Sequence, residues 1–274
     1  MKLPVAVQLY SVRDEMEQDV YGTLQKMKDL GYDGVEFAGL FGEAPEKLKA
    51  FCAEIGLTPI SAHVPYDDML ADPTGVLGDY AALGCKYVAV PYLTEEHRPG
   101  TDGFAATVAG IRKIAEAAKA LGIQLLYHNH DFEFVKIGDD YALDVLYASV
   151  PADLLQTEFD TCWVKVAGED PVAYLKKYAG RSPVVHLKDF EKHGSAGGQL
   201  YQLIGIEEEA AQADAGSFTF KPVGSGMQDF PAILAASVEA GAEWVVVEQD
   251  EPAAGDTRLD SVKQSRDYLR SLGW

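Results

Sequence analysis

The chain has 274 residues, of which 47% are hydrophobic and 24% are charged, as in ordinary globular proteins. Its formal net charge is −20, so it lacks the excess of Lys and Arg that neutralises nucleic-acid phosphates. No apolar run approaches the ~20 residues of a membrane span, and the N-terminus lacks the apolar core and cleavage site of a signal peptide. We therefore expect a cytosolic protein with neither nucleic-acid nor membrane partners, and homo-oligomer formation stays open.

The cysteines are three in number and widely spaced, at Cys52, Cys85 and Cys162, with no C-x-x-C motif. This pattern argues against structural disulfides and against a cysteine zinc site.

Short apolar runs alternate with amphipathic helical patterns along the chain. The runs are too short for helices and suit buried parallel strands. The expected strands lie at residues 4–9, 33–37, 57–63, 85–90, 123–127, 154–160, 183–188 and 244–248. The expected helices lie at residues 19–30, 45–55, 73–83, 101–121, 140–149, 170–178, 231–240 and 259–272.

This alternation predicts a parallel sheet in an α/β fold. Eight strand–helix units in one chain of this length predict a (β/α)8 TIM barrel, a single domain over residues 1–274. A doubly wound open sheet is the alternative, but no G-x-G-x-x-G follows the first strand. Residues 191–226 form the longest connection, and we expect this segment to fold over the barrel mouth as a lid.

Polar side chains crowd the carboxyl end of the fifth strand. The apolar run 123–127 stops at His128, Asn129, His130, Asp131 and Glu133. In a barrel, the carboxyl ends of all strands meet at one face, and ligands bind there. The ends of the other strands add further ionisable groups to that face: His63, Glu158, Asp160, His186, Lys188, Asp189 and Glu248.

A metal site is the interpretation that these residue types favour. Asp160, His186 and Glu248 end the sixth, seventh and eighth strands, and carboxylates with a histidine suit Mn²⁺, Mg²⁺, Co²⁺ or Zn²⁺. Each residue also has a simpler explanation: Asp160 as a helix N-cap, His186 as a hydrogen-bonded core histidine, and Glu248 as a surface acid. The apolar run before Glu248 favours burial, and a buried carboxylate needs a partner.

The whole set of motifs resembles the xylose-isomerase-like TIM-barrel family. The resemblance rests on residues 127–134 (YHNHDFEF), 158–160 (EFD), 186–189 (HLKD) and Glu248. This family includes sugar phosphate isomerases and epimerases, inosose dehydratases and endonuclease IV. The net charge of −20 and the sparse ligand set argue against the endonuclease.

The resemblance implies one divalent metal ion, often Mn²⁺, held by two Glu, one Asp and one His. Asp160, His186 and Glu248 match three of these ligands. The remaining Glu normally ends the fifth strand, where this chain has His128. Glu133 is the first choice for the fourth ligand, Glu158 is the second, and His128 is the third.

The activity implied is that of a metal-dependent isomerase or epimerase acting on a small sugar or keto-sugar. Glu133 and Glu248 would move a proton next to a carbonyl that the metal polarises. A keto-sugar or inosose dehydratase, a lyase, is the alternative with the same site. A non-catalytic sugar-binding barrel would need no metal-ready carboxylates, and metal analysis would separate it from the enzymes. The residues expected to bind substrate are His63, His128, His130, Glu158 and Lys188.

Overall fold

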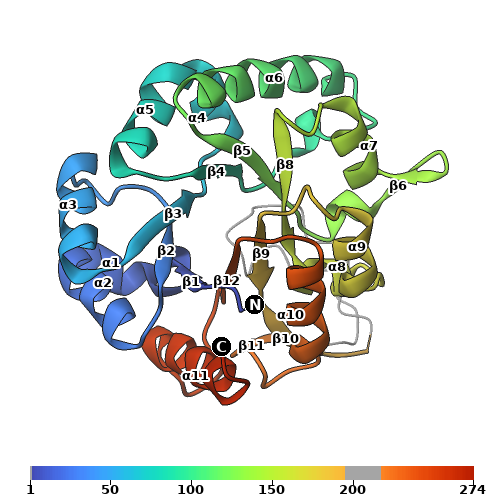
Figure 1. Ribbon diagram of the computed structural model, residues 1–274. Coiled ribbons are helices and arrows are strands. Elements are labelled where there is room, and N and C mark those ends of the chain that lie inside the picture. Colours follow the sequence, from blue (N-terminus) through green and yellow to red (C-terminus); the bar gives the residue numbers. More distant parts are fainter. Residues whose placement is uncertain (1, 195–216) are drawn as a thin grey trace.

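A computed structural model describes residues 2–194 and 217–274. Its main feature is an eight-stranded parallel sheet that curls into a ring with helices outside it (Figure 1). This confirms the predicted (β/α)8 barrel. Around the ring the strands are β3 (Thr58–Ala62), β2 (Gly34–Phe37), β1 (Val5–Gln8), β12 (Trp244–Val247), β9 (Val184–Leu187), β8 (Leu155–Asp160), β5 (Gln124–His128) and β4 (Tyr87–Val90).

The ring nearly closes between β3 and β4. The contacts there include a parallel bridge between His63 and Ala89, where the Val64 amide donates to the Ala89 carbonyl at 3.0 Å, and a hydrogen bond from the Lys86 amide to the Ile60 carbonyl at 3.1 Å. His63 therefore lies at the seam of the barrel.

The outer helices follow the predicted pattern. They are α2 (Val20–Asp29), α3 (Pro45–Ile55), α5 (Pro73–Leu83), α6 (Phe104–Ala120), α7 (Ala142–Ser149), α9 (Pro171–Lys177), α10 (Phe230–Glu239) and α11 (Arg258–Ser271). The bounds of α3 and α5 match the prediction because each begins with a proline and ends at a glycine with positive φ.

Several short elements were not predicted. They are the helices α1 (Arg13–Gln18), α4 (Tyr66–Ala71) and α8 (Thr161–Val166), the 3₁₀ turns η1 (Leu9–Val12), η2 (Glu95–His97) and η3 (Phe132–Phe134), and the hairpin of β6 (Lys136–Ile137) and β7 (Asp140–Tyr141). One or two turns of helix are too short to show a hydrophobic period.

The ends of the expected lid pair with each other. β10 (Asp189–His193) and β11 (Ser217–Lys221) form an antiparallel ribbon, which the sequence pattern did not predict. Residues 195–216 of that segment lie outside the described residues, so the lid stays a prediction.

The barrel interior changes from apolar to polar toward the carboxyl ends of the strands. Side chains on one face of a strand recur every second residue. An apolar layer inside the ring includes Ala6, Leu126, Val184 and Val246. Two residues further along the same strands, the chain places Gln8, His128, His186 and Glu248, all of which are buried. The alternation of side chains along the strands therefore places these polar groups directly next to the apolar layer.

The remaining sequence expectations concern cysteines and membranes. Cys52, Cys85 and Cys162 are free and buried, as expected. Within the described ranges, no helix has the length and apolar character that crossing a bilayer requires.

Candidate active site

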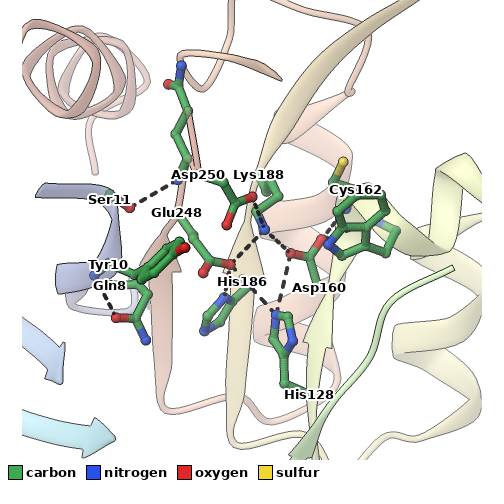
Figure 2. Close-up of polar contacts among 12 residues, drawn as sticks. Gln8, Tyr10, Ser11, His128, Asp160, Cys162, His186, Lys188, Glu248 and Asp250 are labelled. Carbon is green, nitrogen blue, oxygen red and sulfur yellow. Dashed lines mark hydrogen bonds and ion pairs between the residues drawn. The ribbon is translucent and has the colours of Figure 1, made fainter. Parts of the chain in front are cut away.

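Four side chains converge at the mouth of the barrel, and we call them the mouth cluster: His128, Asp160, His186 and Glu248. One donor atom from each lies within 4.8 Å of the others, and all four residues are buried (Figure 2). Glu248 Oε2 lies 3.0 Å from His186 Nδ1 and 3.7 Å from His128 Nε2. Asp160 Oδ2 lies 3.5 Å from His128 Nε2. Two carboxylates and two imidazoles are thus arranged as a cation site would need.

Lys188 extends into the same space. Its ammonium lies 2.8 Å from Asp250 Oδ2, 2.9 Å from Glu248 Oε2 and 3.3 Å from Asp160 Oδ2. Burial opposes the charge of Lys188, but these carboxylates outweigh it and hold the lysine pKa well above its usual value. One ammonium offsets only one of the three carboxylates, and protons on His128 and His186, whose pKa values are both raised, supply further positive charge.

The pKa values of the mouth cluster reflect this excess of carboxylates. Burial alone would lower the pKa of His128, but Asp160 and Glu248 raise it to about 9. Burial would raise the pKa of Glu248, yet Lys188, His128 and His186 bring it well below the usual range. Glu248 therefore stays ionised.

Asp160 fulfils two roles at once. Its Oδ1 accepts the backbone N–H groups of Cys162 at 2.7 Å and Trp163 at 3.1 Å, which caps helix α8. Its Oδ2 lacks a hydrogen-bond partner and lies toward His128 and Lys188. The cap fixes the carboxylate plane, and the second oxygen is left for the site.

Beneath the mouth cluster is a second group, the floor cluster: Glu36, His63, Glu158 and His186. His63 Nε2 lies 2.7 Å from Glu158 Oε2 and 3.2 Å from Glu36 Oε1. His186 Nε2 lies 2.8 Å from Glu36 Oε1, while its Nδ1 belongs to the mouth cluster. His186 therefore joins the two clusters through its two nitrogens.

The pKa values of the two floor carboxylates are shifted in opposite directions. Burial and the neighbouring Glu36 raise the pKa of Glu158 well above its usual value. Burial also acts against ionisation of Glu36, but His63 and His186 overcome it and lower its pKa. Gln8 donates to Glu36 Oε1 at 2.7 Å. Neither Glu36 nor Gln8 was among the candidate residues, because in the sequence each is simply part of a run that is typical of a strand.

Glu133, the first choice for the fourth ligand, lies elsewhere. After β5 the chain turns into η3, which folds the Glu133 carboxylate back against the strand. Its Oε1 accepts the Tyr127 hydroxyl at 2.6 Å, and its Oε2 accepts the His130 amide at 2.8 Å. Burial raises the pKa of Glu133 to about 7. The structure instead brings His128, the third choice, to the other three candidate ligands.

A cavity of about 770 Å³ lies above these groups. The expected substrate-binding residues His63, His128, His130 and Lys188 line it, together with Glu248 and Asp250. Glu158, also expected to touch substrate, is fully buried in the floor cluster and is not part of the lining. The six histidine, lysine and carboxylate groups come from β3, β5, β9 and the segment after β12, so the cavity sits at the carboxyl mouth.

The fold and site define a (β/α)8 barrel with a buried acid–histidine centre at its carboxyl mouth. The family model for the xylose isomerase-like TIM barrel matches residues 24–272, and the chain belongs to that family. An inosose dehydratase of Geobacillus kaustophilus is 25% identical over 272 residues, which cover 91% of this chain and 86% of the relative.

Solved structures show the same fold. A sugar phosphate isomerase/epimerase from Parabacteroides distasonis superposes with a TM-score of 0.78 at 21% identity, covering 99% of this chain and 94% of that one. An IolI protein with a bound zinc atom superposes with a TM-score of 0.71 at 16% identity, covering 99% and 98%.

Proposed function

We propose that the chain is a divalent-metal-dependent isomerase or epimerase that transfers a proton next to the carbonyl of a small sugar or keto-sugar. The observation that carries this proposal is the mouth cluster, which combines two carboxylates and two imidazoles at the base of a large cavity. The names of the relatives, which include isomerases, epimerases and dehydratases of sugars and inososes, support it.

The residues present fit a divalent cation. His128 Nε2 and Asp160 Oδ2 are buried without hydrogen-bond partners, and each is a normal metal-ligand atom. A divalent cation would replace the protons that the carboxylates hold on His128 and His186, whose pKa values are both raised. His128, Asp160, His186 and Glu248 would hold the ion. Mixed nitrogen and oxygen ligands suit Zn²⁺, Mn²⁺ or Co²⁺ better than Mg²⁺, and the zinc of the IolI structure agrees with this.

The bound metal would polarise a substrate carbonyl and make the neighbouring C–H acidic. Glu248 is the base in this proposal. Its contacts among the described residues all use Oε2, which leaves Oε1 to accept a substrate proton at the cavity wall. Lys188 donates hydrogen bonds to substrate oxygens, and His63 and His130 lie along the same lining. Glu133 has no part in this mechanism, because both of its oxygens are hydrogen-bonded outside the cavity.

Dehydration of a keto-sugar or inosose is the second candidate. The identity to an inosose dehydratase over most of both chains favours it. The first proton transfer is the same, with Glu248 as base. A hydroxyl on the next carbon then leaves as water, and the Lys188 ammonium is placed beside Glu248 to protonate it.

The test is whether the protein exchanges the acidic C–H of a substrate for deuterium in D₂O. Metal-loaded protein is incubated with each member of a panel of keto-sugars and inososes, and NMR measures the exchange. We expect exchange in the wild type and none in Glu248→Gln, with metal content measured for both. A change of stereochemistry identifies the epimerase, and loss of water identifies the dehydratase. Wild-type exchange by a metal-loaded Glu248→Gln variant would show that the base lies elsewhere.

A further inference from the structure

The cavity is much larger than the site needs for one sugar ring. A hexose has about twelve heavy atoms, which at the ~30 Å³ of a liquid water each would fill about 360 Å³. The cavity of about 770 Å³ is roughly twice that size. Of the mouth cluster only His128 and Glu248 line the cavity, and most of the other lining residues follow β3 and β4, so that space is available to another part of the substrate.

That second space, which we call the arm, has a different lining. Its lining residues follow β3 and β4 or lie on α4 and α5, and in the strand order β3 lies across the ring from β9, which precedes Lys188. Its walls include Val64, Pro65, Ala71, Val76, Tyr80 and Tyr92. Aliphatic and aromatic side chains of this kind pack against rings, while the polar end fixes orientation.

The described residues of the arm include no Lys or Arg that would bind a phosphate. Among the described residues that line the cavity, Lys188 is the only Lys or Arg, and three carboxylates already surround it. Asp68 and Asp72 add negative charge at the arm. Residues 195–216 contain no Lys or Arg in their sequence, so they bring no basic side chain to the cavity. A phosphorylated sugar would therefore meet repulsion rather than a charge partner.

We propose that the substrate is a neutral, ring-closed keto-sugar that carries a second ring as a glycosidic substituent, with the sugar at the mouth cluster and the second ring in the arm. This inference rests on the proposed function for the chemistry at the mouth cluster. A glycosidic substituent keeps the sugar ring closed, so the carbonyl must be a ring ketone. The two acidic C–H bonds are then those on the ring carbons beside that ketone.

Binding tests the arm without any assumption about turnover. The probes are methyl β-glucoside, phenyl β-glucoside and methyl β-glucoside 6-phosphate, titrated calorimetrically into metal-loaded protein. We expect the phenyl glucoside to bind about tenfold tighter than the methyl glucoside or better, because an aromatic ring becomes buried. The phosphate should bind more weakly than the methyl glucoside.

A bulky side chain in the arm should remove the preference for the phenyl glucoside over the methyl glucoside. In Val76→Trp, the ratio of phenyl to methyl affinity should fall toward one, and Ala71→Phe gives a second variant if that protein does not fold. Val135→Trp is the matched control, since Val135 is 55% exposed and does not line the cavity. Equal affinities in the wild type, an unchanged ratio in both arm variants, or tighter binding of the phosphate would each overturn the proposal.

Exchange in D₂O separates this inference from the proposed function. The same three compounds, oxidised to the ketone at C3, present an exchangeable C–H on each side of the carbonyl. If the phenyl preference is found but no ketone exchanges, the arm stands and the proposed function fails. If the methyl ketone exchanges as efficiently as the phenyl ketone and the phenyl preference is absent, the function stands and the arm fails.

Discussion

Glu133 provides a sharp test of the buried electrostatics. Its carboxyl is 2% exposed, and burial raises its pKa from 4.5 to about 7. The folded chain therefore holds this proton more tightly than the unfolded chain does. Because the pKa of Glu133 is higher in the folded chain than in the unfolded chain, the stability that its proton contributes is fully present below the unfolded-state pKa. That stability is lost as the pH rises through the folded-state pKa. Ionising Glu133 in its folded position should cost about 3 kcal/mol in all, from the ~2.5 units between the two pKa values.

The substitution Glu133→Gln removes this cost and keeps the shape. The amide can still accept the His130 N–H and can donate to the Tyr127 oxygen. Relative to the wild type, the variant should gain about 2–3 kcal/mol in free energy of unfolding between pH 5 and pH 8. Taking the difference between the two proteins cancels the titration of all other groups.

Urea denaturation at pH 5, 6, 7 and 8, with metal removed by a chelator, measures this difference. Glu116→Gln on the exposed surface of α6 controls for the loss of one negative charge. A difference between Glu133→Gln and wild type that is the same at every pH would refute the reasoning, and would place the ionised carboxylate in a better solvated position.

Three further substitutions test the two clusters and the turn at residues 224–228, which is hydrogen-bonded to Asp189. His186→Ala should lower metal content sharply in elemental analysis, and full occupancy in the variant would exclude the mouth cluster as the metal site. Glu36→Gln should weaken metal binding about 10–100-fold in chelator competition, because Glu36 Oε1 holds His186 Nε2 at 2.8 Å; unchanged affinity would show that Glu36 does not orient the histidine. Asp189→Ala should lower the free energy of unfolding by about 2–4 kcal/mol in urea, because the carboxylate accepts backbone N–H groups of Gly224, Gly226 and Gln228; a loss below ~0.5 kcal/mol would contradict this.

The barrel was predictable from the sequence because its signals are local. Each strand is a short apolar run, and helices such as α3 and α5 carry a proline at one end and a glycine at the other. The ends of the strands were predictable for the same reason. The prediction that Asp160, His186 and Glu248 lie together at one face of the barrel was therefore correct. The elements that escaped prediction, such as α8 and the ribbon of β10 and β11, depend on contacts between distant segments or are too short to show a period.

The depth of each polar side chain in the barrel was not predictable. Glu36 and Glu158 both occur in ordinary strand sequences, and only the register of the strands places them against His63 and His186. Glu133 shows the converse. It is close to the site in sequence, but a single 3₁₀ turn directs its carboxylate back to Tyr127. Which side chains reach the mouth cluster therefore depends on the direction of the backbone after the strand, which residue types alone do not give.

His186 connects the chemistry at the mouth to the fold beneath it. An imidazole that presents Nδ1 to Glu248 must direct Nε2 to the opposite side, and there the register of β2 and β8 supplies Glu36 and Glu158. Each nitrogen of His186 therefore faces a carboxylate, Glu248 at Nδ1 and Glu36 at Nε2, and these two carboxylates together fix the plane of the ring. The two glutamates of the floor cluster do not line the cavity, but they orient a histidine of the mouth cluster. The two buried glutamates have His63 and His186 as charge partners, and the donor atoms of this floor cluster also lie close enough together to hold a cation.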